Sequence, residues 1–318
     1  MKIIDFFKRI GLFFKNIFLN LFDRLKPRKS FRWIFTLVLW LIIIVYLIFG
    51  IIFGIKIYKN HSEEKTVKFA TKIYPFPAAI VNGGVVWTKD YYQQLFYIRQ
   101  FSQETKQPLP DPQTLRKQII DQLVENEILE MQALKNNIQV STKDINDAYQ
   151  KIVSQSGGSS EVKKVLNELY GMNEKDFKKL IRQQVLKEKI QNELIVQVKV
   201  AHILIKDEGR ANEIADRAKK GEDFGALAKE FSEDTKSRDS GGELGWLAKG
   251  QLVVDNNNIP EFDESAFKAK VGEIIGPVKT AVGFEIIKVE DRKGKIAENF
   301  NTWLSELKKQ AKIWRLIK

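Results

Sequence analysis

The chain has no cysteine and only two histidines, His61 and His202, among its 318 residues. The absence of thiols excludes disulfides, thiolate nucleophiles and cysteine-bound metals. Two histidines are too few for a metal site built from several histidines. The sequence also contains no phosphate-binding loop.

Negative charge is scarce at both ends of the chain, and the formal net charge is +12. Residues 1–32 hold nine Lys/Arg against two Asp/Glu, and residues 293–318 hold seven against two. Residues 199–292, which look most compact, hold fifteen basic against nineteen acidic residues. Because the basic charge avoids that segment, the sequence does not favour nucleic acid as a partner.

Charge is absent altogether from residues 33–55, WIFTLVLWLIIIVYLIFGIIFGI. A helix of this length rises about 34 Å, which is enough to cross a hydrocarbon core of about 30 Å. A cleaved signal peptide is the alternative, but the apolar run is too long and no small-residue cleavage site follows it. The pattern therefore predicts a transmembrane helix.

The basic residues on either side of this run predict its orientation. Nine precede it, and five lie in residues 56–75. Because cytoplasmic flanks carry the excess of Lys and Arg, we expect a single-pass protein of the cell membrane with a cytoplasmic N-terminus. The main body is then extracytoplasmic.

The basic segment 1–32 has a wide apolar helical face over residues 3–25. We expect this helix to lie in the cytoplasmic leaflet, so that residues 1–55 as a whole contact lipid. Its cationic side chains would meet anionic headgroups; they are Lys8, Arg9, Lys15 and Arg24. The alternative is a second spanning helix, which the six charges in the stretch disfavour.

The next part of the chain is predicted to be helical. Residues 56–77 are polar and lysine-rich, which predicts a linker. In residues 78–88, AAIVNGGVVWT, the sequence Asn82-Gly83-Gly84 between two apolar runs is typical of a β-hairpin. Capping residues and helical spacing then indicate five helices, at about 91–103, 112–136, 142–156, 161–170 and 174–195. They carry no catalytic signature, so their apolar faces indicate mutual packing in an all-α domain over 78–197. A groove for extended chains is the alternative.

The period of the apolar residues changes at residue 197. A strand at 198–205, two helices, a strand at 241–247, a helix at 263–270 and two last strands follow, the second of them holding Glu285. The order β-α-α-β-α-β-β predicts a small domain with an antiparallel sheet over 198–292. Residues 293–318 return to a helical pattern, and this helix is expected to pack on the 78–197 helices. The fold class is therefore α+β, with the sheet domain inserted in or appended to the all-α domain and an N-terminal transmembrane helix.

Six motifs in register then resemble the parvulin family of peptidyl-prolyl isomerases over residues 199–292. They are VAHILI, KKGEDF, ALAKEFSED, GGELGWLAKGQL, PEFDESAF and VGEIIGPVKTAVGFEIIKVED. The flanks, 78–195 and 296–318, are similar to the helical chaperone part of parvulin foldases of the surface-antigen chaperone and extracytoplasmic foldase type. That similarity depends on the helix order, on LVENEILEMQALKNNIQVSTKDI and on the trailing helix.

The resemblance implies a membrane-anchored peptidyl-prolyl cis-trans isomerase that helps exported polypeptides to fold. Its partners would be unfolded or proline-containing exported chains. Turning an X–Pro bond breaks no covalent bond, so a cofactor is not needed. The alternative is a tethered chaperone, a holdase whose parvulin-like domain binds clients without catalysis. A structural tether without clients is a more distant alternative.

The resemblance also implies the residues of the site. A pocket for the proline ring falls on Leu244, Leu252 and Phe262, for which ordinary core packing is the alternative. Catalytic roles fall on His202 in VAHILI, on Asp234 in FSEDT and on Thr280 in GPVKT. For Asp234 a turn or capping role, and for Thr280 a strand-end role, are the alternatives.

Glu285 departs from the family pattern. Where the family's last strand reads glycine-aromatic-histidine, this chain reads Gly283-Phe284-Glu285. We expect Glu285 to face His202 from a neighbouring strand, accept a hydrogen bond from the imidazole and favour its protonated form. A solvated glutamate at a strand end is the alternative. The replacement leaves open whether the activity is normal, weakened or lost.

Overall fold

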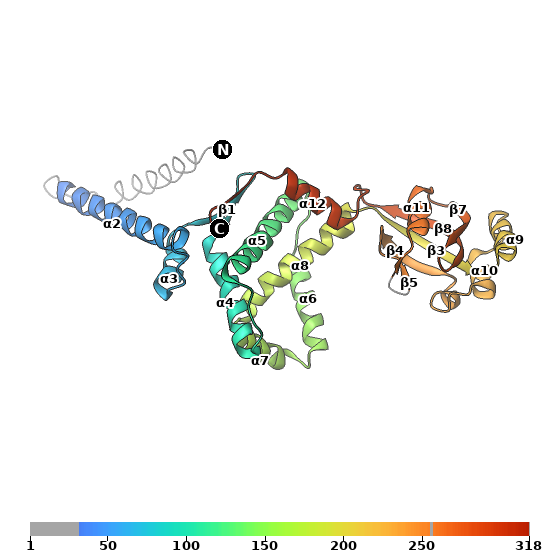
Figure 1. Cartoon of the computed structure of the whole chain (residues 1–318), viewed down its shortest axis with the longest axis horizontal. Helices are drawn as coiled ribbons and strands as arrows, with labels where there is room; N and C mark the ends of the chain where they lie inside the picture. The colour runs from blue at the N-terminus through green and yellow to red at the C-terminus, as the bar shows by residue number, and fades with distance from the viewer. Residues whose placement is uncertain (1–31, 255–256, 318) are drawn as a thin grey trace. The chain divides into compact units, whose positions relative to one another are not determined.

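The structure is a computed structural model that describes residues 32–254 and 257–317 (Figure 1). The predictions for residues 1–31, including the helix over 3–25 and its lipid contacts, lie outside the described residues. The fold divides into two compact units. Among the described residues, one comprises 32–128, 153–177 and 311–317, and the other comprises 129–152, 178–254 and 257–310.

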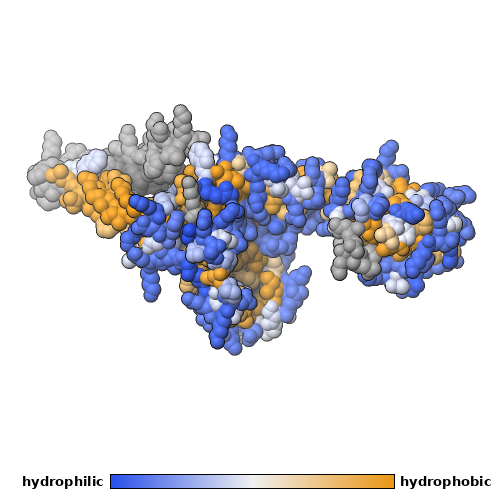
Figure 2. Space-filling view, in the orientation of Figure 1, coloured by the Kyte–Doolittle hydropathy of each residue, from blue (hydrophilic) through white to orange (hydrophobic). Residues whose placement is uncertain are grey.

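The first unit begins with helix α2, Arg32–Tyr58, which covers the predicted span. Within the described residues, Thr36–Tyr58 has the length and composition to cross a membrane, with a mean hydropathy of 3.0. Its side chains form an apolar surface along the helix (Figure 2).

A second helix, α3, Lys65–Ile73, follows where a linker was predicted. That prediction was wrong for these residues. Val67, Ala70 and Thr71 recur at helical spacing and are buried, which holds the segment against the rest of the unit. Three lysines in nine residues masked this pattern in the sequence.

The predicted hairpin is confirmed: β1, Pro77–Val81, pairs antiparallel with β2, Gly84–Trp87. Asn82 and Gly83 turn the chain with positive φ angles of 48° and 96°, a conformation that Asn and Gly adopt most easily. A third strand, β9, Ile313–Arg315, adds to the other edge of β1. The helical prediction for 293–318 was therefore correct for α12, Phe300–Gln310, and wrong for 293–299 and 311–317. The apolar residues after α12 pair with β1 instead.

All five predicted helices are present: α4 Thr88–Thr105, α5 Pro112–Lys135, α6 Thr142–Gln155, α7 Ser159–Tyr170 and α8 Glu174–Leu194. Asp111 caps α5 by accepting hydrogen bonds from the backbone N–H groups of Gln113 and Thr114, both at 3.0 Å. Gly171 ends α7 in the left-handed conformation. In the second unit, Lys189 of α8 pairs with Asp144 of α6 at 2.7 Å.

The second unit contains the predicted antiparallel sheet, in the order β4-β3-β8-β7. Its strands are β3 Gln197–Ile205, β4 Glu243–Ala248, β7 Ile274–Thr280 and β8 Gly283–Lys293. Helices α9 Glu208–Lys219, α10 Phe224–Phe231 and α11 Pro260–Lys268 complete the predicted order. Two additions were not predicted, a short 3₁₀ turn at Arg238–Ser240 and a small pairing of β5, Val253–Val254, with β6, Asn257–Asn258.

The two faces of this sheet bury different side chains, because successive residues of a strand point to opposite sides. On one face Ala201, Ile203 and Ile205 of β3 join Ile286 of β8 in a cluster with residues of α9 and α10. On the other face Val198, Val200, Ile287 and Val289 form a cluster with Phe262 and Ala266 of α11. The candidate site lies on this second face, which we call the α11 face.

Candidate active site

His202 and Glu285 meet on the α11 face of the sheet. His202 stands opposite Ile287 of β8, and Glu285 lies two residues before Ile287 on the same face of the sheet. The imidazole Nδ1 is 2.8 Å from a carboxylate oxygen of Glu285, and both residues are buried. The structure thus confirms that Glu285 faces His202, and the alternative of a solvated glutamate was wrong.

Asp234 occupies the other side of the same ring. His202 Nε2 is 3.0 Å from Oδ2 of Asp234 and 2.9 Å from Oγ of Ser237. The Ser237 hydroxyl donates to that same Asp234 oxygen at 2.5 Å, and the backbone N–H groups of Lys236 and Ser237 also donate to Asp234. Asp234 therefore does both things that were predicted as alternatives. It accepts the backbone hydrogen bonds of a turn, and it contacts His202.

Ser237 was not predicted. It is buried and contacts both His202 and Asp234, so it belongs to the network as fully as they do. Its place three residues after Asp234, in a turn, was the available signal. A serine in a polar loop does not stand out in a sequence, however.

The two carboxylates favour a charged imidazole. Burial alone would lower the pKa of His202, but the hydrogen bonds and charges of Glu285 and Asp234 outweigh burial and raise this pKa above its usual value. For Asp234 the effects are reversed. Burial alone would raise its pKa, but the hydrogen bonds from Ser237 and His202 outweigh burial and lower this pKa to about 2. A carboxylate oxygen at each ring nitrogen is best satisfied when both nitrogens carry hydrogen.

The three predicted pocket residues lie on the same face. Phe262 of α11 is buried, with its ring centroid 6.1 Å from that of His202 in an edge-to-face arrangement. Leu244 of β4 and Leu252 are half-buried and pack on the cluster that contains Phe262. We call Leu244, Leu252 and Phe262 the apolar cup. Figure 2 shows apolar surface exposed on this domain.

Thr280 is not joined to the His202 network among the described contacts. Its hydroxyl donates to the backbone oxygen of Gly283 at 3.0 Å and accepts from the backbone N–H of Val282 at 3.3 Å. Val282 in turn packs on the same apolar cluster as the residues of the cup. The threonine therefore shapes the turn between β7 and β8, and its position matches the strand-end alternative.

Asp263 is a second residue that was not predicted. One oxygen accepts the backbone N–H of Gly250 at 2.6 Å, which ties the segment before Leu252 to α11. The other oxygen, Oδ1, is buried and has no hydrogen-bond partner in the described part of the chain. Burial raises the pKa of Asp263 above its usual value. Its place in the first turn of a helix made it look like an ordinary helix-dipole residue.

Comparison with known proteins agrees with both halves of this architecture. A family model described as a PPIC-type PPIASE domain matches residues 178–293, and one described as a SurA-like N-terminal domain matches residues 22–191. The second match covers more than half of the chain. The predicted resemblances to parvulins and to the helical foldase chaperones are thereby confirmed.

Individual relatives are named as foldases. The foldase protein PrsA of Caldanaerobacter subterraneus subsp. tengcongensis is 34% identical over 233 residues, covering 67% of this chain and 72% of the relative. Foldase protein PrsA 3 of Bacillus cereus is 44% identical over 117 residues, 37% of this chain and 39% of its own length. The crystal structure of PrsA from Bacillus anthracis has 28% identity and a TM-score of 0.31, and the match covers 60% of this chain and 86% of that one.

The fold and the matches define a two-part protein, with a SurA-like helical part and a PPIC-type isomerase domain. The chain belongs to the PrsA/SurA family of foldases.

Proposed function

We propose that this protein is a membrane-anchored prolyl isomerase that assists the folding of exported polypeptides outside the cytoplasm. The observation that carries the proposal is the His202 ring between Asp234 and Glu285, on the same sheet face as the apolar cup. The network and the cup supply the two things that the reaction needs.

The first need is a dry site for the pyrrolidine ring. Partial double-bond character gives the X–Pro bond a rotation barrier of about 18–20 kcal/mol. An apolar pocket that holds the ring lets the rest of the peptide turn about the bond. Phe262, Leu252 and Leu244 offer such a surface.

The second need is a polar group that favours the twisted amide over the planar one. Resonance in the planar amide adds partial negative charge to its carbonyl oxygen, and twisting reduces that charge. A carboxylate near this oxygen therefore destabilises the planar form more than the twisted one. Asp234 suits this role, because its side chain is 20% exposed, against 7% for His202 and 2% for Glu285.

The other residues predicted to be catalytic then act indirectly, by positioning the groups that contact the substrate. We assign His202 and Glu285 as positioning residues that hold Asp234 and fix its charge, with Ser237 in support. Thr280 is a positioning residue of the β7–β8 turn, through its bond to Val282. The cup binds the ring, and no metal or other cofactor takes part.

Unfolded, proline-containing exported chains are the proposed substrates. Support comes from the SurA-like helical part, which offers more surface than a lone isomerase domain, and from relatives named as foldases. The apolar helix α2 supports a membrane anchor, and the basic residues ahead of it support a cytoplasmic N-terminus. Residues 1–55 would contact the lipid.

A tethered holdase is the second candidate, and Glu285 is the observation that favours it. It stands where the family pattern has a second histidine, so the domain could bind prolines without turning them over. The full chain in detergent should be assayed for isomerisation of a proline tetrapeptide, with Glu285→His and Phe262→Ala alongside. We expect the wild type to catalyse, Phe262→Ala to lose most of the activity, and Glu285→His to equal or exceed the wild type.

The same assay separates the two candidates. A wild type that is inert at high enzyme concentration, yet saturably binds the peptide and suppresses client aggregation, would select the holdase. A wild type that neither catalyses nor binds would remove both candidates.

A further inference from the structure

Helix α3 leaves an apolar edge uncovered beside α2. Phe69 is 63% exposed and Ile73 is 53% exposed, although both are large apolar side chains. They lie four residues apart and so share one side of the helix. The opposite side, with Val67 and Ala70, is buried in the unit.

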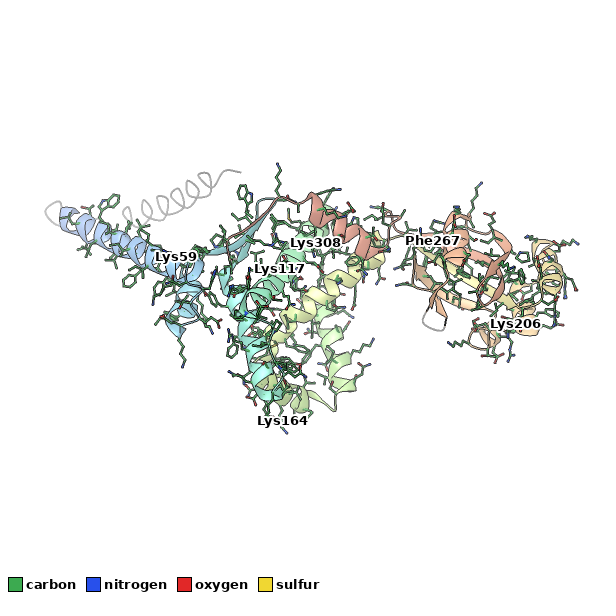
Figure 3. The ribbon with its side chains drawn as sticks, viewed as in Figure 1. Lys59, Lys117, Lys164, Lys206, Phe267 and Lys308 are labelled. Carbon is green, nitrogen blue, oxygen red and sulfur yellow. The ribbon has the colours of Figure 1, made fainter. Side chains whose placement is uncertain are left out.

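Positive charge borders this edge. Lys65, Lys68 and Lys72 are the charged residues of α3, and the helix contains no Asp or Glu. The nearest preceding acidic residues have partners of their own, since Glu64 pairs with Lys56 at 2.8 Å and Glu63 pairs with Arg99 at 2.5 Å. Lys59, exposed after the end of α2, adds to the positive charge of the region (Figure 3). An apolar edge next to lysines is the composition of a helix that lies in a membrane interface.

The aromatic residues after α3 fix its level along α2. Tyr74 stacks on Tyr46 with ring centroids 4.4 Å apart, and Phe76 contacts Tyr58 edge-on at 6.2 Å. Tyr58 is the last residue of α2 and Tyr46 lies near its middle, so the two rings lie along the second half of the helix. The C-terminal end of α3 is thus held against the apolar part of α2 rather than beyond it.

Two glycines make room for this contact. A Cβ atom at Gly50 would stand 3.5 Å from the Tyr74 ring, and one at Gly54 would stand 3.7 Å from the Phe76 ring. The rings therefore rest directly on the backbone of α2. Figure 1 shows α3 running crosswise to α2, as a helix lying in the plane of a membrane would if α2 spans it.

We propose that α3 is an interfacial helix that binds the anionic phospholipid surface beside the anchor. Phe69 and Ile73 enter the boundary of the acyl chains, and the three lysines of α3 reach the headgroup phosphates. The proposal rests on the membrane anchoring proposed above and adds a second lipid contact on the extracytoplasmic side.

The chain has no cysteine, so a single engineered cysteine can carry a nitroxide label at a chosen position. We would label Phe69→Cys in the full chain, reconstituted in phosphatidylcholine vesicles with and without phosphatidylglycerol. Collisions with oxygen report lipid and collisions with a water-soluble nickel chelate report water. Leu134→Cys, an exposed apolar residue of α5, is the water control, and Leu41→Cys in α2 is the anchor control.

We expect the oxygen-to-nickel ratio at Phe69 to exceed that at Leu134 by about threefold or more in the anionic vesicles, because the label enters the acyl boundary. Replacing Lys65, Lys68 and Lys72 by Gln should lower this ratio toward that of Leu134 in anionic vesicles only. A free phosphate source is tested by adding inorganic phosphate, which should leave the ratio unchanged.

The other outcomes overturn the proposal in distinguishable ways. Leu41 in lipid with Phe69 in water would leave the anchor standing and remove the interfacial role of α3. Leu41 and Phe69 both in water would remove the anchor, and the interfacial role with it. A Phe69 label shielded from both reagents would show that protein, such as a second copy of the chain, covers α3 instead of lipid.

Discussion

The two faces of the β3–β8 sheet are built on opposite principles. The face toward α9 and α10 is closed by apolar side chains such as Ile203 and Ile286. The α11 face has an apolar cluster of its own, which includes Phe262, but places His202 and Glu285 beside it. Burying charged groups stabilises a fold less than apolar packing does, and often costs free energy. We infer from this contrast that the first face serves stability and the second serves the proposed reaction.

The largest effect on stability is expected from a cavity in the face of the sheet toward α9 and α10. Ile203→Ala should lower the free energy of unfolding by about 2–5 kcal/mol, because Ile203 is fully buried. Urea unfolding of the isolated full chain, followed by tryptophan fluorescence, measures this. Isomerase activity of the folded fraction should stay within about twofold of the wild type. A strong loss of activity without a loss of stability would contradict the division between the faces.

The next largest effect is expected at Asp234. Asp234→Asn keeps the shape but removes the negative charge, so kcat/KM for a proline tetrapeptide should fall about 100-fold. Asp239→Asn is the matched control, since Asp239 lies in the same loop and its side chain is 82% exposed. Equal activity in the two variants would show that Asp234 is only a turn residue.

The α11 face, unlike the face toward α9 and α10, should make the stability of the fold depend on pH, because it buries His202 and Glu285. The pKa of folded His202 is raised, so its pairing stabilises the fold fully below the unfolded pKa of about 6.5 and is lost as pH rises through the folded pKa. One proton limits the slope to about 1.4 kcal/mol per pH unit. Glu285→Gln should lower the pKa of His202 and flatten this slope, as measured by urea unfolding across pH and by NMR titration of the imidazole. An unchanged His202 titration in Glu285→Gln would show that the two groups are not coupled.

The smallest effect is expected at Asp263. Asp263→Ala removes the bond to the backbone of Gly250 and frees the segment that carries Leu252, so KM should rise about fivefold while kcat changes little. Steady-state kinetics with the tetrapeptide separates the two constants. Glu264→Ala, at the next position and exposed, is the control. A fall in kcat at constant KM would place Asp263 in the chemical step.

Local signals in the sequence predicted most of the fold. Asn82-Gly83 specified the hairpin, Asp111 and Gly171 marked helix ends, and strand alternation put Glu285 at the start of an otherwise apolar strand face. Each of these depends on neighbouring residues alone or on the period of a strand.

The predictions that were wrong or missing concern residues whose structure depends on partners far away in the sequence. Ile313 and Trp314 continue a helical pattern, and only the open edge of β1 makes them a strand. The three lysines of α3 obscured its helical pattern in the sequence, so the segment was predicted as a linker. Ser237 could be found only once the loop after α10 was folded over His202.

Exchange NMR on a proline peptide at equilibrium tests the central claim most directly, because it detects catalysed cis-trans interconversion without a coupled reaction. With catalytic amounts of the full chain we predict cis–trans exchange peaks, which disappear with Asp234→Asn and with Phe262→Ala and persist with Asp239→Asn. Exchange no faster than in the peptide alone, with the wild type folded and in excess over its binding constant, would contradict the claim that the cup and the histidine network form an isomerase site.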